Sequence, residues 1–168
     1  ACLFLGSGSV ILGCHHEQDM RKMGGLKKYM PATHWTYFIA CMAITTAPFF
    51  FLANGFYSKD EILLESYSHP ELFWAGLIGA FMTAIYTFRL IFVAFHGEEK
   101  TEVHAIHGAD YWLPLGILLV LSTGLGALIV PPLDGVLPAS HEVEEGAKHF
   151  VEIMTIATAF VGTGLAVF

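Results

Sequence analysis

Long apolar runs that carry almost no charge dominate this sequence, and they limit the chain to one kind of fold. A helix needs roughly 20 apolar residues to cross the hydrocarbon core of a bilayer. Four of the five runs reach or approach that length, and short polar connectors separate them. The runs cover 1–14, 32–57, 72–95, 112–133 and 150–168. This pattern predicts a membrane protein with several helical crossings.

The composition supports the same class and excludes others. Hydrophobic residues make up 55% of the chain and charged residues only 14%, with a mean hydropathy of +0.60. Soluble domains contain about a quarter charged residues. The net charge of -7 leaves no basic surface to neutralise phosphates, so we expect no nucleic-acid partner.

We predict an all-α polytopic transmembrane bundle that includes a discontinuous helix. Residues 1–168 form a single transmembrane region, interpreted as a fragment of a longer subunit because Ala1 already lies inside an apolar run. The expected helices cover 1–14 (truncated), 32–48, 49–66 (broken), 72–95, 112–132 and 150–168.

Lys59 and Asp60 are the candidate functional residues because apolar sequence flanks them closely on both sides. On a helix, Ile62 and Leu63 share the face of Lys59. Desolvation opposes the charged form of an amine in such a setting, and a carboxylate such as Asp60 favours it. An amine at that balance can gain and lose a proton, which a proton carrier inside a membrane requires.

The sequence before Lys59 favours a helix broken in the membrane. Asn54-Gly55 relaxes the backbone, and Ser58 followed by Glu61 is a capping-box pattern, so we expect a short helix from Lys59 to Ser66. Interrupted helices build ion sites in many transporters. The alternative is an intact span over 33–57, with Lys59 extending into water.

A polar path is also possible on the span 72–95. Arg89 either faces the bundle interior or extends to the nearby interface, and the hydroxyls of Tyr86 and Thr83 share its helix. We predict no metal site, because His15, His16 and the three cysteines lack further ligands at suitable spacing.

Four sequence blocks carry a family resemblance over essentially the whole chain. They are GSGSVILGCHHEQDMRKMGGL, GFYSKDEIL, GAFMTAIYTFRLIFVAFHGE and GALIVPPLDGVLP. Together they resemble the antiporter-like subunits of the proton-pumping NADH:quinone oxidoreductase (respiratory complex I), the group that contains the bacterial L subunit and mitochondrial subunit five.

The resemblance implies a fold and a role for the candidate residues. It implies inverted repeats that each contain a discontinuous helix, with Lys59 matching the lysine of the second one and Asp60 the acidic residue beside it. The chain is then a proton-translocating subunit of an oxidoreductase, a translocase with no redox chemistry of its own. Charge shifts elsewhere in the complex change the proton affinity of buried lysines in turn.

The resemblance also implies cofactors, partners and location. NADH, FMN, iron–sulfur clusters and quinone belong to other subunits, and this chain holds no cofactor. The partners are the other antiporter-like subunits of the membrane arm and the lipid bilayer. The location is the bacterial inner membrane as a multi-pass protein, or alternatively the mitochondrial inner membrane. Two rivals are an Mrp-type sodium/proton antiporter subunit and a non-transporting membrane scaffold.

Overall fold

The regular structure of the chain is helical throughout the described residues. A computed structural model describes residues 1–45, 54–104, 108–123 and 145–167, and the all-α prediction is confirmed for these ranges. The elements are α1 (Cys2–Gly13), the short 3-10 helix η1 (Met20–Lys22), α2 (Leu26–Tyr29), α3 (Pro31–Thr45), α4 (Asn54–Ser66), α5 (Pro70–Phe95), α6 (Ala109–Leu121) and α8 (Glu145–Leu165).

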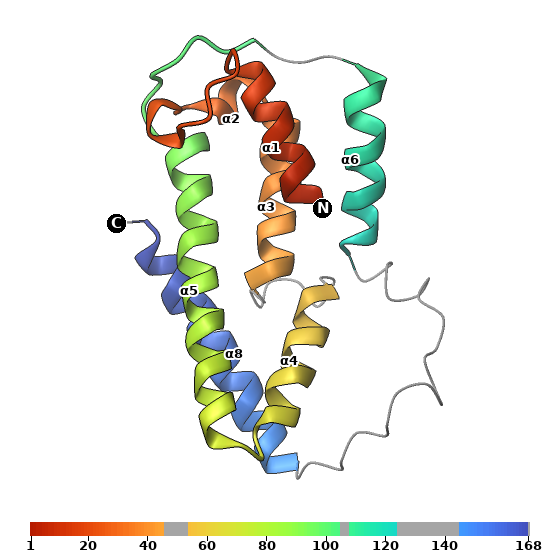
Figure 1. Cartoon of the computed structure of the whole chain (residues 1–168), viewed down its shortest axis with the longest axis vertical. Coiled ribbons are helices and arrows are strands. Elements are labelled where there is room, and N and C mark those ends of the chain that lie inside the picture. Colours follow the sequence, from red (N-terminus) through yellow and green to blue (C-terminus); the bar gives the residue numbers. More distant parts are fainter. Residues whose placement is uncertain (46–53, 105–107, 124–144, 168) are drawn as a thin grey trace.

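Helix α5 is the longest element and runs along most of the molecule (Figure 1). Its 26 residues give a length of about 39 Å, more than the hydrocarbon thickness of a bilayer. Pro70 occupies the first turn, where its missing N–H costs no helical hydrogen bond. Among the described residues, α5 is the one helix that is both long and apolar enough to cross a membrane, by length and composition.

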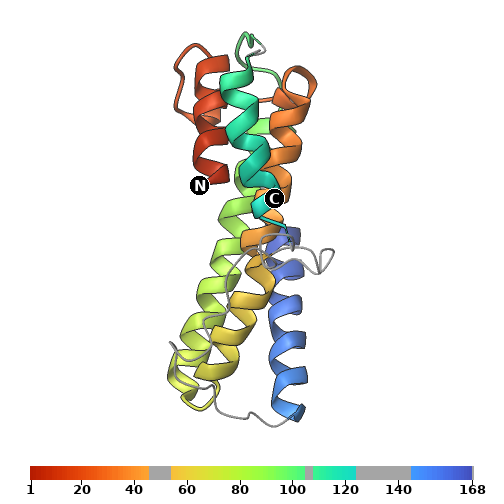
Figure 2. The same cartoon turned by 90° about the vertical axis from the view of Figure 1, so that its right-hand side faces the viewer.

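Helices α3 and α4 lie one after the other beside α5 (Figures 1 and 2). The start of α3 reaches the end of α5, where the rings of His34 and Phe95 are 5.3 Å apart. The end of α4 packs against the start of α5, where Leu63 clusters with Phe73. At 15 and 13 residues, the two helices are only about 22 and 20 Å long, so each covers roughly half of α5.

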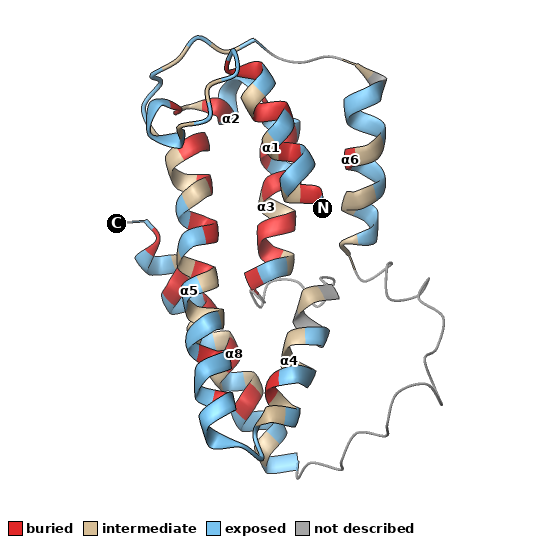
Figure 3. Cartoon of the chain, in the orientation of Figure 1, coloured by how far each residue is buried: buried red, intermediate tan, exposed pale blue. Residues whose placement is uncertain are grey.

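The upper half of the bundle is closed by α1 and α6, and the lower half by α8. Gly6 of α1 allows Tyr37 of α3 to approach, because a Cβ at Gly6 would meet its ring. Gly162 of α8 has the same role against Ala84 of α5. Figure 3 shows the buried residues of α1, α3 and α5 turned toward one another, with more exposed residues on the outer faces.

Two connectors, 14–30 and 96–104, pack on each other beyond the start of α3 and form what we call the polar end. Lys28 Nζ donates to Glu99 Oε1 at 3.4 Å, and Thr101 Oγ1 donates to the carbonyl of Lys22 at 2.7 Å. Gly24 lies against the backbone of Glu98 so closely that a Cβ would overlap the Glu98 carbonyl.

Several predicted boundaries need correction. The predicted short helix from Lys59 begins instead at Asn54, so Ser58 lies inside it and donates to the carbonyl of Gly55 rather than capping its start. Helix α8 begins at Glu145 rather than at 150. The predicted ends of the segments 32–48 and 112–132 lie outside the described residues.

Candidate functional site

The amine of Lys59 lies where α3 ends and α4 begins. Its Nζ donates a hydrogen bond of 2.6 Å to the carbonyl oxygen of Ile44. Ile44 belongs to the last turn of α3, and the residue four further along the sequence is Pro48, which has no amide hydrogen to donate to its carbonyl. Helical side chains lean toward the N-terminus of their own helix, so Lys59 reaches back past the start of α4 to this carbonyl.

Gly55 makes this junction possible by the absence of its side chain. A Cβ at Gly55 would overlap the carbonyl oxygen of Ala43, the residue before Ile44 in α3. The pattern Asn54-Gly55 indicated a relaxed backbone, whereas the structure gives the glycine a packing reason. The first turn of α4 can therefore touch the last turn of α3 and bring Lys59 within reach.

The two helix ends act on the amine in opposite ways. The carbonyl end of α3 carries partial negative charge and favours the ammonium form, whereas the amide end of α4 carries partial positive charge and opposes it. In the described part of the chain, Lys59 has no carboxylate partner within salt-bridge distance. The polar partner of Lys59 in the described structure is therefore a backbone carbonyl rather than a carboxylate.

Asp60 faces a different neighbour from Lys59, although the two are consecutive. Its carboxyl group lies within hydrogen-bonding reach of the Thr155 hydroxyl on α8, with Glu152 nearby. One carboxyl oxygen, Oδ1, is buried and accepts no hydrogen bond from the described residues. Sequence reasoning paired Asp60 with Lys59, whereas the structure directs Asp60 to α8.

Glu152 and Thr155 are site residues that the sequence analysis missed. The predicted span 150–168 puts Glu152 in its first turn, a place where the helix dipole favours a carboxylate. Because α8 begins at Glu145, Glu152 instead lies further inside the helix, three residues before Thr155. That spacing puts the two side chains on one face, which is the signal that identifies them.

The residues of the predicted polar path lie away from this site. Tyr86 is 63% exposed, and Arg89 is also exposed and has no ion pair among the described residues. Thr83 Oγ1 donates to the carbonyl of Gly79 within its own helix at 2.7 Å. Within this chain, Lys59 and these three residues are not brought together.

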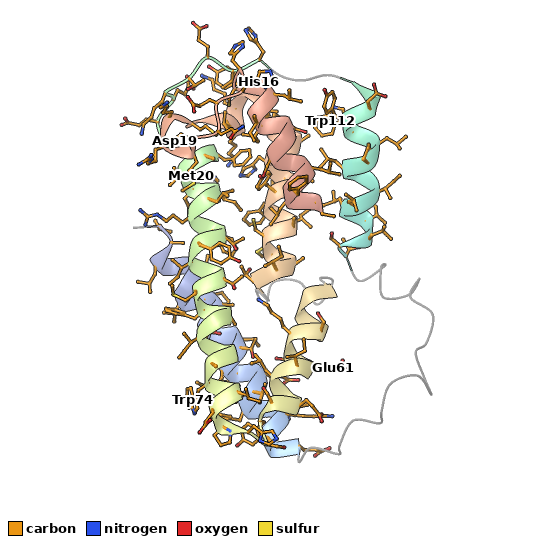
Figure 4. The ribbon with its side chains drawn as sticks, viewed as in Figure 1. His16, Asp19, Met20, Glu61, Trp74 and Trp112 are labelled. Carbon is orange, nitrogen blue, oxygen red and sulfur yellow. The ribbon has the colours of Figure 1, made fainter. Side chains whose placement is uncertain are left out.

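The charged groups outside the bundle gather at the polar end and pair locally. Figure 4 shows Asp19 and Met20 beside the end of α5, whereas Glu61 points away from α5 on the outer side of α4. The Arg21 guanidinium donates to Asp19 and, with the Arg21 amide, lowers the pKa of that carboxyl to about 2. No group of three or more metal-ligating side chains occurs among the described residues.

Comparison with known proteins places the chain in a membrane family. Residues 1–86 match the family described as NADH:quinone oxidoreductase/Mrp antiporter, transmembrane. The chain belongs to this family, which confirms the resemblance predicted from the four sequence blocks.

Individual relatives narrow the comparison. The chain is 57% identical to NADH-quinone oxidoreductase subunit L of Pseudomonas aeruginosa and 50% identical to that of Escherichia coli, in both cases over 99% of this chain and 27% of the relative. It is also 40% identical to NADH-ubiquinone oxidoreductase chain 5 of Phytophthora infestans, over 75% of this chain and 20% of the relative. The chain thus spans about a quarter of the length of these curated relatives.

Proposed function

We propose that this chain is part of a proton-translocating membrane-arm subunit of NADH:quinone oxidoreductase, with Lys59 as a relay group. One observation carries the proposal: the Lys59 amine binds the Ile44 carbonyl at the junction of two half-length helices. The family and the relatives named subunit L support the assignment. The redox cofactors then belong to other subunits, and the partners are the neighbouring membrane-arm subunits in an inner membrane.

The proposal treats residues 31–66 as a single membrane crossing that is discontinuous. The start of α3 lies at the end of α5, and the end of α4 lies at the start of α5, so the two helices together run antiparallel to α5 over its length. Neither is long enough to cross alone, since each covers only about 20 Å. A chain that crossed twice here would return α4 to the side where α3 begins.

Lys59 has the hydrogen-bonding capacity that a relay group needs. An ammonium has three donors, and within the described residues one of them is used by Ile44. The other two have no acceptor in the described part of the chain and can pass a proton to water or to a neighbouring group, after which the neutral amine accepts the next proton. A change of charge near the junction shifts the protonation equilibrium of Lys59. Among the described residues, no carboxylate pairs with the amine and holds it in the charged form.

Asp60 extends the relay toward α8. The Thr155 hydroxyl gives its hydrogen to the carbonyl of Val151 at 2.8 Å, so it can accept a hydrogen bond but has none left for a carboxylate. A protonated Asp60 satisfies this arrangement by donating to Thr155. Because Glu152 lies nearby, Asp60 and Glu152 can share and exchange a proton between α4 and α8.

Replacement of Lys59 in the complete subunit tests the proposed function. We expect Lys59→Ala to reduce NADH-driven proton translocation severalfold while the complex still assembles. Glu61→Ala is the matched control, because Glu61 is a charged neighbour on the exposed face of α4. Normal translocation by Lys59→Ala would contradict the proposal.

Two further measurements separate the rival functions. Sodium-dependent proton exchange without NADH would favour an Mrp-type antiporter, which the family description also includes. A non-transporting scaffold predicts that Lys59→Gln, which keeps a hydrogen-bond donor to Ile44, has unchanged proton translocation. We expect that variant to be defective, since an amide does not carry a proton at working pH.

A further inference from the structure

His34 is a buried titratable residue that the Lys59 relay does not use. It lies in the second turn of α3 and is only 4% exposed. Neither of its ring nitrogens has a hydrogen-bond partner among the described residues. A neutral imidazole has one donor and one acceptor, and a dry interior leaves both unsatisfied at a cost in free energy. A water molecule beside the ring would supply the missing hydrogen bonds.

The surroundings of His34 are apolar except on one side. Phe95 and Phe38 contact the ring, with centroids 5.3 and 6.2 Å away. On the remaining side lies His96, whose ring is 5.0 Å from that of His34 and nearly perpendicular to it. Among the described residues, Lys27 of α2 is the charged side chain that acts on His34 in addition to His96.

His96 connects this buried ring to solvent. It is exposed and lines an open hollow of about 660 Å³ at the polar end, together with Lys27, Lys28 and Glu98. One face of the His96 site therefore meets water, and the other meets His34. The two imidazoles therefore lie in sequence between the solvent-exposed surface and the interior of the bundle.

A stripe of polar side chains continues from His34 along α3. Tyr37, Cys41 and Thr45 follow at spacings of three, four and four residues, which places all four on one helical face, and all are buried. Cys41 Sγ lies 4.0 Å from the carbonyl of Thr87 on α5, and the Thr87 hydroxyl is buried without a partner among the described residues. The stripe ends beside Ile44, the residue that binds Lys59.

We propose that His34 and His96 form a proton-exchange site that connects the hollow at the polar end with Lys59 along this stripe. The inference rests on the proposed function and adds a second group to it. A ring nitrogen of His96 takes a proton from water and passes it to the free nitrogen of His34. His34 then releases the proton on its other nitrogen to water in the interior, so both rings return to the neutral form and one proton has moved inward.

Variants of the complete subunit in its membrane complex test the site. We expect His34→Phe, which keeps the ring and loses both nitrogens, to reproduce the loss of NADH-driven proton translocation seen with Lys59→Ala. His69→Phe is the matched control, since His69 is exposed before α5 and its side chain makes no capping hydrogen bond. Its proton translocation should equal that of the unmodified complex.

A rescue experiment distinguishes proton exchange from packing. In His96→Ala, free imidazole added to the medium can occupy the open hollow, and we expect it to restore the lost translocation, whereas a merely structural role predicts no rescue. Normal translocation by His34→Phe, or failure of imidazole to rescue His96→Ala, overturns the proton-exchange site. If Lys59→Ala alone is defective, the proposed function stands without it. If Lys59→Ala is normal, the proposed function itself fails.

Discussion

At the polar end of the bundle three ion pairs join exposed side chains, whereas at the junction of α3 and α4 a single amine meets a backbone carbonyl. Arg21–Asp19, Lys22–Glu17 and Lys28–Glu99 have N···O distances of 2.9, 3.1 and 3.4 Å. Each such exposed pair contributes little to stability, because water competes for both partners. The Lys59 amine has no carboxylate among the described residues and depends on the placement of two helix ends.

The comparison shows where this molecule depends on exact backbone positions. Charges at the polar end can be lost or rearranged with little effect on the helices. At the junction, the distance from Lys59 to Ile44 is set by how closely α4 approaches α3, and Gly55 sets that approach. Changes at the junction should therefore have larger effects than changes of similar size at the polar end.

The largest effect is expected from Gly55→Val. The valine side chain would overlap the Ala43 carbonyl, so α4 must move away from α3. This movement breaks the hydrogen bond from Lys59 to the Ile44 carbonyl. We expect a loss of about 3 kcal/mol in the free energy of unfolding, measured by denaturation in detergent, together with loss of proton translocation. Gly79→Ala is the control, because a Cβ there meets open space. If the Gly55→Val protein were as stable as this control, the close contact of α3 and α4 would not depend on Gly55.

A smaller loss is expected from Gly24→Ala at the polar end. The new Cβ would overlap the Glu98 carbonyl, but both residues lie in connectors that can shift without bending a helix. We expect a loss of about 1–2 kcal/mol in the same denaturation experiment, with proton translocation retained. A loss as large as that of Gly55→Val would show that the two regions do not differ as described.

The smallest effect concerns Asp19 and depends on pH. Its folded pKa of about 2 is below the ordinary value of 3.8, so its stabilising contribution is complete above 3.8 and disappears as the pH falls through about 2. Asp19→Asn should slightly lower the unfolding temperature near neutral pH and leave it unchanged below pH 2. High salt should reduce the difference, because the pair is exposed. If the difference in unfolding temperature were the same at both pH values, the effect of Asp19→Asn would not come from its ion pair with Arg21.

Exclusion of charge over many residues is a strong local signal for a long apolar helix. The span predicted over 72–95 is α5, Pro70–Phe95. The start of α4 was wrong because Ser58 and Glu61 match a capping pattern, and sequence alone does not show that Gly55 must touch Ala43.

The partners of the site residues were harder to predict than the helices. Lys59 was identified from its apolar flanks, but its carbonyl partner lies 15 residues earlier in another helix. Asp60 turns to α8, more than 80 residues away, because of how the helices pack. His34 gave a detectable signal in its spacing to Tyr37, Cys41 and Thr45, although a single histidine in an apolar helix looks like an ordinary core residue.

The proposed proton relay depends most directly on residues 31–66 forming one discontinuous membrane crossing with Lys59 at the gap. Single cysteines placed at Lys27 and Ser68, in an otherwise cysteine-free complete subunit, can be labelled from each side of sealed membranes with an impermeant thiol reagent. For a single crossing we expect labelling of the two positions from opposite sides of the membrane. Labelling of both from the same side would mean two crossings, and would remove the junction at which Lys59 meets Ile44.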